Sequence, residues 1–195
     1  MNEIAVAQTW IFLGRVPLLK DMFNQIKNIP LFPKPSGGLW ICPYHPQRKF
    51  KSSWQKWCSE NNFKEYKNGS IITLPKNTRT YIIDSQKDLI KLIEEVGSSP
   101  ECELFPFWKI IDFEKASERY DLIYLTEKGQ RETRMPWKNR EYNLYSWDVC
   151  CGLLLNYKIR SQKPIRLPFS PEESRITRTD SLDPQQIAES LLKNS

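Results

Sequence analysis

Residues 36–58, SGGLWICPYHPQRKFKSSWQKWC, combine a glycine turn, a short apolar run and a polar loop that is marked by prolines. Gly37 and Gly38 can adopt positive φ and allow another group to approach the backbone closely. The apolar run predicts a strand over residues 38–42, and Pro43 closes it because proline cannot donate a hydrogen bond to a sheet. The stretch therefore predicts a tight turn that leads into a strand beside a binding site.

Two tryptophans follow this strand, three residues apart, at the start of a predicted helix. Ser52 or Ser53 is a suitable N-cap, and the spacing places Trp54 and Trp57 on one face of the helix. Indole faces stack on flat heterocycles and attract cationic rings, and a nicotinamide ring is both flat and cationic. These residues therefore indicate a pocket for a nicotinamide dinucleotide; the alternative is that both tryptophans belong to the core.

The composition is that of one globular domain. The chain has 195 residues, of which 39% are hydrophobic, so it can bury a substantial core. No apolar run approaches the roughly 18 residues that a membrane-spanning helix needs, and the start of the chain lacks the basic region of a signal peptide. Five cysteines without regular spacing fit a reducing compartment better than a disulfide framework. We therefore expect a cytoplasmic protein with no membrane segment.

Basic residues exceed acidic ones, with 29 Lys and Arg against 23 Asp and Glu and a net charge of +6. This surplus favours an anionic partner such as nucleic acid or a phosphate-bearing ligand; a solvated basic surface is the alternative. Interleaved cationic and aromatic side chains suit single-stranded nucleic acid, through charge attraction and base stacking. The segment RETRMPWKNR has this pattern, and its candidate nucleic-acid-binding residues are Arg131, Arg134, Trp137, Lys138 and Arg140.

The sequence lacks the short motifs of common catalytic sites, namely GxSxG, HExxH, the P-loop and GxGxxG. Its single histidine, His45, leaves no material for histidine-based triads. Cys42, His45 and Cys58 offer three zinc ligands, but no CxxC pair completes the set. We therefore expect no metal site.

The pattern along the chain predicts short strands interleaved with short helices. Strands are predicted over residues 8–14, 38–42, 70–74, 80–84, 121–126, 144–147 and 152–159. Helices are predicted over residues 16–29, 52–58, 86–96 and 112–120, a loop over 31–36 and a loop or hairpin over 127–143. Because regular βαβ spacing is absent, we expect the α+β class with a mostly antiparallel or split sheet.

The composition changes near residue 164, after which Pro, Ser, Thr and charged residues dominate. A terminal helix is predicted over residues 181–193, with Asp183 as its N-cap and Pro184 in its first turn. We therefore expect one domain over residues 1–163 and a linker with a C-terminal helical tail over residues 164–195. The terminal helix either packs on the domain or binds a protein partner.

Taken in order, these segments resemble the ADP-ribosyltransferase fold, in particular its polymerase-like and toxin branches. The resemblance lies in IFLGR at 11–15, GLWIC at 38–42, KSSWQKWC at 51–58, YDLI at 120–123, YSWD at 145–148 and GLLLN at 152–156. It spans about residues 8–160 and implies a split β-sheet core with short helices. It also implies NAD as the substrate.

The resemblance implies a catalytic acid near the last strand. In the family a histidine or arginine ends the first strand; here Leu13 stands in that place and Arg15 follows two positions later. The family's glutamate begins the last strand, where Cys150 and Cys151 stand here, and Asp148 is the nearest acid. Asp148 is therefore implied as the carboxylate that stabilises positive charge on the ribose. The alternative is a turn aspartate that caps its own backbone.

The resemblance also implies the residues that hold NAD. Trp57 stands in the place of the aromatic residue that stacks on nicotinamide. Arg15 can grip the pyrophosphate as a fork-shaped donor, or is an ordinary surface arginine. The implied NAD-binding residues are Arg15, Gly38, Leu39, Trp40, Ser53, Trp54 and Trp57.

We therefore expect an NAD-dependent ADP-ribosyltransferase that modifies a macromolecular acceptor, either nucleic acid or protein. Such an enzyme would act as a toxin or as a phage-defence or counter-defence factor. Two alternatives stay open. One is a catalytically inactive module of the same fold that binds nucleic acid through its basic residues, and the other is an inhibitor that binds a partner through its C-terminal helix.

Overall fold

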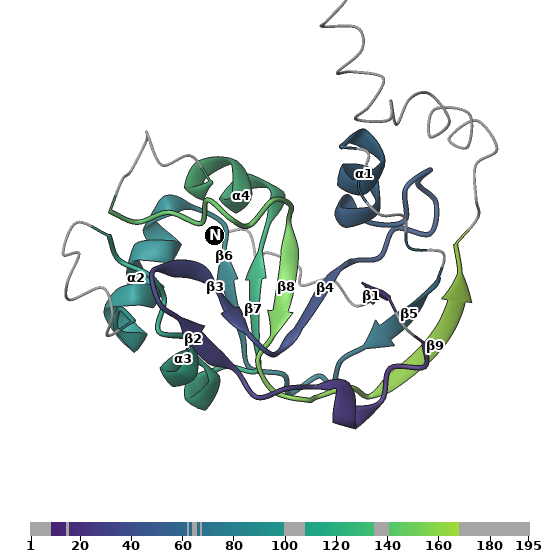
Figure 1. Ribbon diagram of the computed structural model, residues 1–195, viewed down its shortest axis with the longest axis horizontal. Helices are drawn as coiled ribbons and strands as arrows, with labels where there is room; N and C mark the ends of the chain where they lie inside the picture. Colours follow the sequence, from purple (N-terminus) through teal and green to yellow (C-terminus); the bar gives the residue numbers. More distant parts are fainter. Residues whose placement is uncertain are drawn as a thin grey trace, which may run out of the picture.

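A computed structural model of the protein describes residues 9–14, 16–61, 63, 66, 68–99, 108–134 and 141–167. In these residues the fold is mixed α/β, with a seven-stranded mixed sheet, a two-stranded sheet and four α-helices. The strands are β1 (Trp10–Leu13), β2 (Lys27–Ile29), β3 (Phe32–Ser36), β4 (Leu39–Pro43), β5 (Asn68–Thr73), β6 (Thr80–Ile83), β7 (Leu122–Leu125), β8 (Cys151–Leu154) and β9 (Ser161–Arg166). The helices are α1 (Ser53–Glu60), α2 (Gln86–Val96), α3 (Phe113–Arg119) and α4 (Glu127–Thr133) (Figure 1). None of these helices is long and apolar enough to cross a membrane.

The large sheet has the strand order β6-β7-β8-β4-β1-β5-β9. Its neighbouring strands are antiparallel except β6 and β7, which are parallel. The mostly antiparallel sheet that the sequence predicts is thereby confirmed. The second sheet is the hairpin of β2 and β3, which packs near α3.

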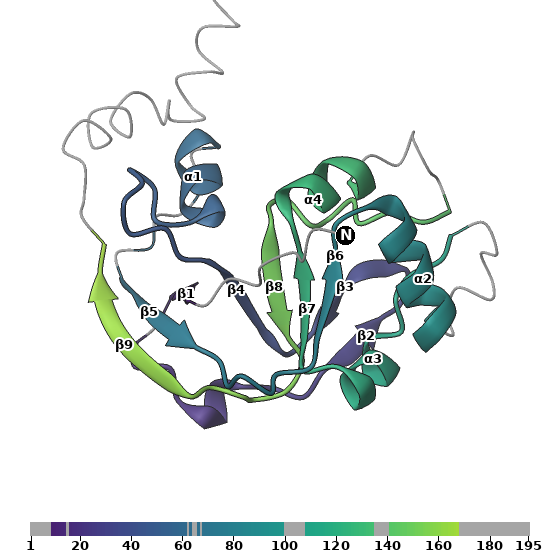
Figure 2. The ribbon, with the colours of Figure 1, turned by 180° about the vertical axis from the view of Figure 1, so that it is seen from behind.

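Strand β4 belongs to two parts of the large sheet. Its residues Leu39, Trp40 and Ile41 pair with β8, whereas Cys42 and Pro43 pair with β1. This change of partner within one short strand lets β6-β7-β8 diverge from β1-β5-β9. Figures 1 and 2 show the two groups of strands spread apart toward α1 and α4.

Alternating side chains along the strands build an apolar layer on each face of the sheet. In β7, Ile123 and Leu125 contribute to the layer that includes the buried residues of α2 and α3. Leu122 and Tyr124 contribute to the opposite layer, which contains Trp10. Because both faces are buried, the central strands are almost wholly apolar.

Sequence signals that act over only a few residues predict several helices and strands correctly. Ser52 caps α1 by accepting a hydrogen bond from the Gln55 N–H, and Ser85 caps α2 in the same way. Gly97 ends α2 with a φ of 90°. Strands β1, β4, β5, β6 and β7 and helix α3 also occur where they are predicted, within a few residues.

The helix predicted over residues 16–29 is wrong. That segment holds only the 3₁₀ turn η1 (Lys20–Met22), followed by β2. Its apolar residues serve opposite layers, because Leu18 packs in the layer of Trp10 and Ile26 packs in the other. The loop predicted over residues 31–36 is also wrong, since β3 occupies most of it. A two-stranded hairpin tolerates the prolines of β3 because most of its backbone is at an edge.

Two further expectations about the C-terminal half are wrong. The segment predicted as a loop or hairpin over residues 127–143 begins with α4, whose N-cap Thr126 accepts a hydrogen bond from the Gly129 N–H. The strand predicted over residues 144–147 is a turn that buries Leu144 and Trp147.

Strand β9 continues through residue 164, the expected start of the linker. Residues 168–195, including the helix expected over 181–193, lie outside the described residues.

A buried carboxylate joins the chain before β6 to the chain after β8. Asp121, which is only 1% exposed, accepts hydrogen bonds from the backbone N–H and the guanidinium of Arg79. It also accepts a hydrogen bond of 2.8 Å from Lys158 Nζ. Burial alone would raise the pKa of Asp121, but these hydrogen bonds outweigh burial and hold that pKa well below its usual range.

Replacing Asp121 by Asn removes the negative charge that holds Arg79 and Lys158. We expect the free energy of unfolding at neutral pH to fall by about 3 kcal/mol, as when one partner of a buried ion pair is removed. Because the pKa of Asp121 is lowered by folding, its contribution is complete above about pH 4 and is lost as the pH falls through the lowered pKa. Urea titrations at several pH values measure both effects.

The exposed Asp21 provides the control, since Asp21→Asn should leave the free energy of unfolding at neutral pH unchanged. Equal stability of Asp121→Asn and the wild type at neutral pH would show that this carboxylate does not hold the fold together.

Candidate functional site

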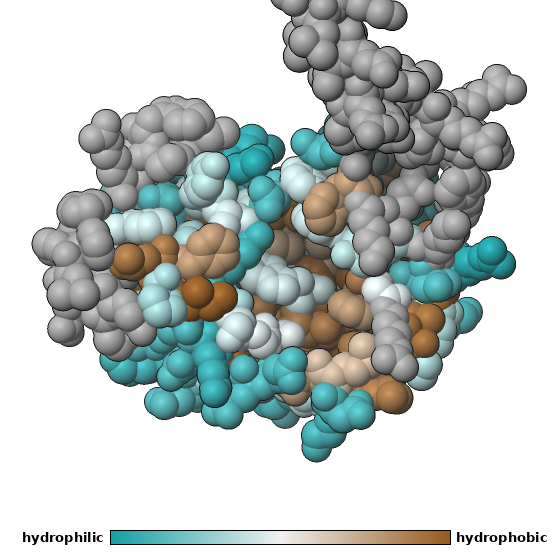
Figure 3. Space-filling model, viewed as in Figure 1, coloured by the Kyte–Doolittle hydropathy of each residue, from teal (hydrophilic) through white to brown (hydrophobic). Residues whose placement is uncertain are grey.

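Two cavities adjoin one another on the face of the sheet between its diverging groups of strands. The split cavity has a volume of about 440 Å³ and is lined by β1, β4, α1 and the turn that precedes β8. The basic cavity has a volume of about 580 Å³ and is lined by α1, α4 and the loop between β4 and α1. Asp148 and Val149 line both cavities. Figure 3 shows this face hollowed between the two groups of strands, with apolar surface at the bottom of the hollow.

The split cavity lies where β1 separates from β4. Their ladder consists of Ile11 with Cys42 and Trp10 with Pro43. Beyond Ile11, the side chains of Phe12 and Leu13 line the cavity. The part of β4 before Cys42 therefore faces the cavity along an edge that is not paired with β1, and such an edge offers main-chain donors and acceptors.

Two of the tryptophans that line the split cavity, Trp40 and Trp147, pack against each other. The rings of Trp40 and Trp147 are 4.7 Å apart and meet edge to face. Trp147 is fully buried, and its Nε1–H donates a 2.7 Å hydrogen bond to the carbonyl oxygen of Pro33. This bond joins the turn before β8 to β3 and so fixes the position of the next residue, Asp148.

Asp148 is held between two cations. Its carboxylate lies 3.4 Å from Lys34 Nζ of β3 and 3.4 Å from Arg134 Nη2 at the end of α4. Its carbonyl oxygen accepts a hydrogen bond from the Gln130 side chain. The Asp148 side chain is 26% exposed, so it is accessible from the cavities. Within the described residues the carboxylate binds these cations and does not cap its own turn.

The two tryptophans of α1 stack on one another and line different cavities. The rings of Trp54 and Trp57 are 4.8 Å apart and almost parallel, and Phe63 meets both edge to face. Trp54 lines the split cavity, whereas Trp57 lines the basic cavity. Both side chains are half-buried rather than sealed in the core. The two tryptophans thus do not line one cavity together, contrary to the prediction that both line a single nicotinamide pocket.

The glycine turn has the backbone conformation that the sequence predicts. Gly37 and Gly38 have φ values of 77° and 65°. A Cβ atom at Gly38 would lie 2.6 Å from Ile26 Cδ1 and 2.9 Å from the Leu154 carbonyl oxygen. The space beside the glycines is therefore filled by the protein's own chain. Gly38 still lines the split cavity, together with Leu39.

The Ser53 hydroxyl beside the cavities is already partnered, and the thiols of Cys42, Cys150 and Cys151 are protonated. Ser53 lines the basic cavity, and its Oγ–H donates a 2.7 Å hydrogen bond to the Cys150 carbonyl oxygen. Burial raises the pKa of the Cys42 thiol to about 12 and raises the pKa of Cys150 and Cys151 as well. These cysteines are therefore thiols at neutral pH, and Asp148 is the acidic side chain that lines both cavities.

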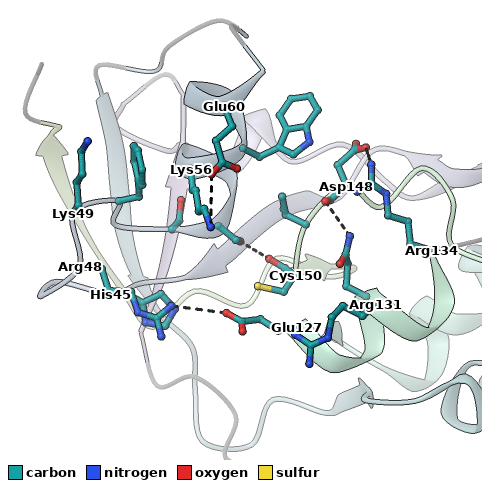
Figure 4. A pocket seen from close by; sticks show the side chains of 16 residues that line it. His45, Arg48, Lys49, Lys56, Glu60, Glu127, Arg131, Arg134, Asp148 and Cys150 are labelled. Atoms are coloured by element: carbon teal, nitrogen blue, oxygen red, sulfur yellow. Dashed lines mark hydrogen bonds and ion pairs between the residues drawn. The ribbon is translucent and has the colours of Figure 1, made fainter. Parts of the chain in front are cut away.

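The basic cavity gathers cations from separate segments. Figure 4 shows Arg48, Lys49 and Lys56 on one side and Arg131 and Arg134 on the other. Its acidic lining residues are Glu60, Glu127 and Asp148. His45 also lines it, and burial together with the nearby Arg48 lowers the pKa of His45, so its imidazole is neutral at about pH 7.

The structure brings many of the expected site residues together. Gly38, Leu39, Trp40, Trp54 and Asp148 line the split cavity. Ser53, Trp57, Arg131 and Arg134 line the basic cavity. Arg15, Trp137, Lys138 and Arg140 lie outside the described residues.

Sequence reasoning missed several residues that line the cavities. Lys34 and Trp147 were not identified, because they belong to a strand and a turn that the pattern misassigns. Tyr66 carries no local signal, since its segment has no regular period. Arg48 and Lys49 belong to a short run of basic residues, RKFK at 48–51, that carries no recognised motif. Lys56 could have been identified from its position on α1, one residue before Trp57.

Within the described residues, no group of three or more His, Cys, Asp or Glu side chains could hold a metal ion. Comparison with protein-family models, curated proteins and solved structures found no match to this chain.

Trp147→Phe should show whether the bond to Pro33 fixes the turn that carries Asp148. The variant keeps an aromatic ring but leaves a buried carbonyl oxygen without its donor, so we expect the free energy of unfolding to fall by about 1–3 kcal/mol. Denaturant titration measures this loss. The half-buried Trp57 is the control, and Trp57→Phe should cost less. Equal losses in the two variants would contradict the role of the Nε1–H.

Proposed function

We propose that the protein is an NAD-dependent ADP-ribosyltransferase and that the nicotinamide end of NAD binds in the split cavity. The observation that carries the proposal is that one cavity is lined by Gly38, Trp40, Trp54 and Asp148, which come from three separate segments of the chain. Its volume of about 440 Å³ lies in the range of small-molecule sites. The diverging sheet also supports an ADP-ribosyltransferase-like split sheet as the finer description of the fold.

The lining of the split cavity suits a flat cationic ring that carries a carboxamide. Trp40 and Trp54 are half-buried indoles that can contact the ring. A carboxamide needs one donor and one acceptor, and the edge of β4 before Cys42 can offer both from its main chain. Lys34 and Arg134 provide positive charge near Asp148 for the diphosphate.

The chemistry requires a carboxylate beside the ribose. The bond between the nicotinamide nitrogen and ribose C1″ breaks, its electron pair goes to the nitrogen, and neutral nicotinamide leaves. Positive charge develops on the ribose, and the Asp148 carboxylate stabilises it. Lys34 and Arg134 hold that carboxylate in place, which reduces the reorganisation needed in the transition state.

The same two cations favour a second candidate function. They neutralise much of the charge of Asp148 in the free protein, and a carboxylate that stays bound to them stabilises the ribose less. A protein of this kind would bind NAD or nucleic acid without turnover. Nicotinamide release distinguishes the two functions directly.

Asp148→Asn should keep NAD binding within about threefold and slow nicotinamide release by at least about a hundredfold, the loss typical of removing one electrostatic group from an active site. Trp54→Ala should weaken NAD binding by roughly ten- to a hundredfold through the loss of ring contact. Calorimetry measures NAD binding, and mass spectrometry of NAD and nicotinamide measures release.

Tyr145→Ala is the matched control, because this exposed aromatic residue lies in the same turn as Asp148 and lines neither cavity. Its binding and release should equal those of the wild type. Wild-type rates in Asp148→Asn would refute its catalytic role, and a wild type that releases no nicotinamide would refute the enzyme.

A further inference from the structure

We propose that the basic cavity is the acceptor site and that the acceptor is single-stranded nucleic acid. The proposal rests on the proposed function, because it names the substrate that receives ADP-ribose. It depends on residues of the loop after β4, of α1 and of α4, and it does not use the segment around Trp137.

The charge of the basic cavity fits a phosphate backbone. Lys49 and Arg131 lie on opposite sides of the cavity (Figure 4), and neither side chain has a carboxylate partner among the described residues. Arg48 pairs with Glu127 at 3.8 Å, but both side chains are more than 60% exposed, so this pair is weak. The cavity therefore offers cations on both sides to an entering strand.

Aromatic rings lie among these cations. Trp57 and Phe50 line the cavity, and Lys49 Nζ lies 5.2 Å from the centre of the Phe50 ring. Trp57 is supported from behind by the parallel ring of Trp54, so its position is well fixed. Bases stack on such rings regardless of their identity, by about 1–3 kcal/mol each. In a duplex the base faces are already stacked, so the cavity selects unpaired nucleotides.

The two cavities meet at the residue that would perform the chemistry. Asp148 lines both of them, and Arg134 of the basic cavity binds its carboxylate at 3.4 Å. A nucleotide in the basic cavity therefore approaches the ribose of NAD from the side opposite to the β4 edge. This arrangement places donor and acceptor on either side of one carboxylate.

The transfer step balances without a further reactant. A nucleophilic N–H or O–H of the acceptor nucleotide forms a bond to ribose C1″ as the bond from C1″ to the nicotinamide nitrogen breaks. The leaving nicotinamide takes the electron pair of that bond. The acceptor's proton goes to the Asp148 carboxylate and then to solvent. The products are ADP-ribosylated nucleic acid, nicotinamide and one proton.

The adenosine diphosphate part of NAD has the same chemistry as a nucleotide of the acceptor, since both carry phosphate and a base. The location of the cavity favours the acceptor, because the cavity is also lined by Phe50, Trp57 and two cations, Lys49 and Arg131, that have no carboxylate partner in the part of the chain that the structure describes. Competition separates the two sources. ADP-ribose should bind together with an oligonucleotide if the basic cavity holds the acceptor, and should displace it if the cavity holds the donor.

The test measures fluorescence anisotropy of labelled twelve-nucleotide single strands of DNA and of RNA, without NAD. We expect Lys49→Glu and Arg131→Glu each to weaken binding about fivefold or more and to lower the salt dependence, by about 0.7 in slope for each lost phosphate contact. The matched controls are Lys87→Glu on α2 and Arg160→Glu before β9, both exposed and outside the cavities. Both controls should bind as the wild type does, and a duplex should bind more weakly than either strand.

The acceptor proposal fails if the wild type does not bind either strand, if Lys49→Glu and Arg131→Glu bind as the wild type does, or if ADP-ribose displaces the strand. Label transfer from NAD to the bound strand, lost in Arg131→Glu while nicotinamide release continues, supports it. Nicotinamide release without these binding effects contradicts the acceptor proposal alone. If neither the wild type nor any variant releases nicotinamide, the proposed function fails, and the acceptor role fails with it.

Discussion

Strand β4 pairs with β8 through its first residues and with β1 through its last residues. The geometry of both cavities depends on this change of pairing partner. A strand paired along its whole length on both sides would leave no edge between Leu39 and Cys42. The divergence opens the sheet toward α1 and α4. The glycines before β4 make the entry possible, because side chains at Gly37 and Gly38 would collide with the segment before β2 and with β8. The tight turn is therefore needed for the packing of the fold, whereas the unpaired edge of β4 contributes to the candidate site.

The position of Asp148 follows from contacts that are remote in sequence. Trp147 is buried under the turn and bound to Pro33 of the hairpin, so the next residue projects into the divided part of the sheet. Lys34 and Arg134 then reach it from two sides. One carboxylate is thereby shared by an aromatic cavity and a basic one, which is the arrangement that a transfer between two large substrates needs. The nearby Cys151 is buried and protonated, so the proposed chemistry relies on the Asp148 carboxylate and not on a thiolate.

Local signals identified α1, α2 and β4 from the sequence, because an N-cap serine, a terminating glycine or a closing proline acts over a few residues. The β2–β3 hairpin was missed because the apolar spacing over residues 16–29 fits a helix. In the structure Leu18, Met22 and Phe23 pack in the layer of Trp10, Leu19 is exposed and Ile26 packs in the other layer. Lys34 lies in β3 of this hairpin. Its ion-pair partner, Asp148, is 114 positions away in the sequence, so no local pattern could place Lys34 in the site. The stacking of Trp54 on Trp57 was equally hidden, since helical spacing states which face two residues share but not whether a ligand can lie between them.

The most direct test is a crystal structure of the Asp148→Asn variant grown with NAD. The nicotinamide ring should lie in the split cavity against Trp40 or Trp54, with its carboxamide bound to the main chain of β4 before Cys42. Ribose C1″ should lie next to the side chain of residue 148. An NAD molecule bound elsewhere, or a split cavity that stays empty at saturating NAD, would contradict the assignment of this cavity.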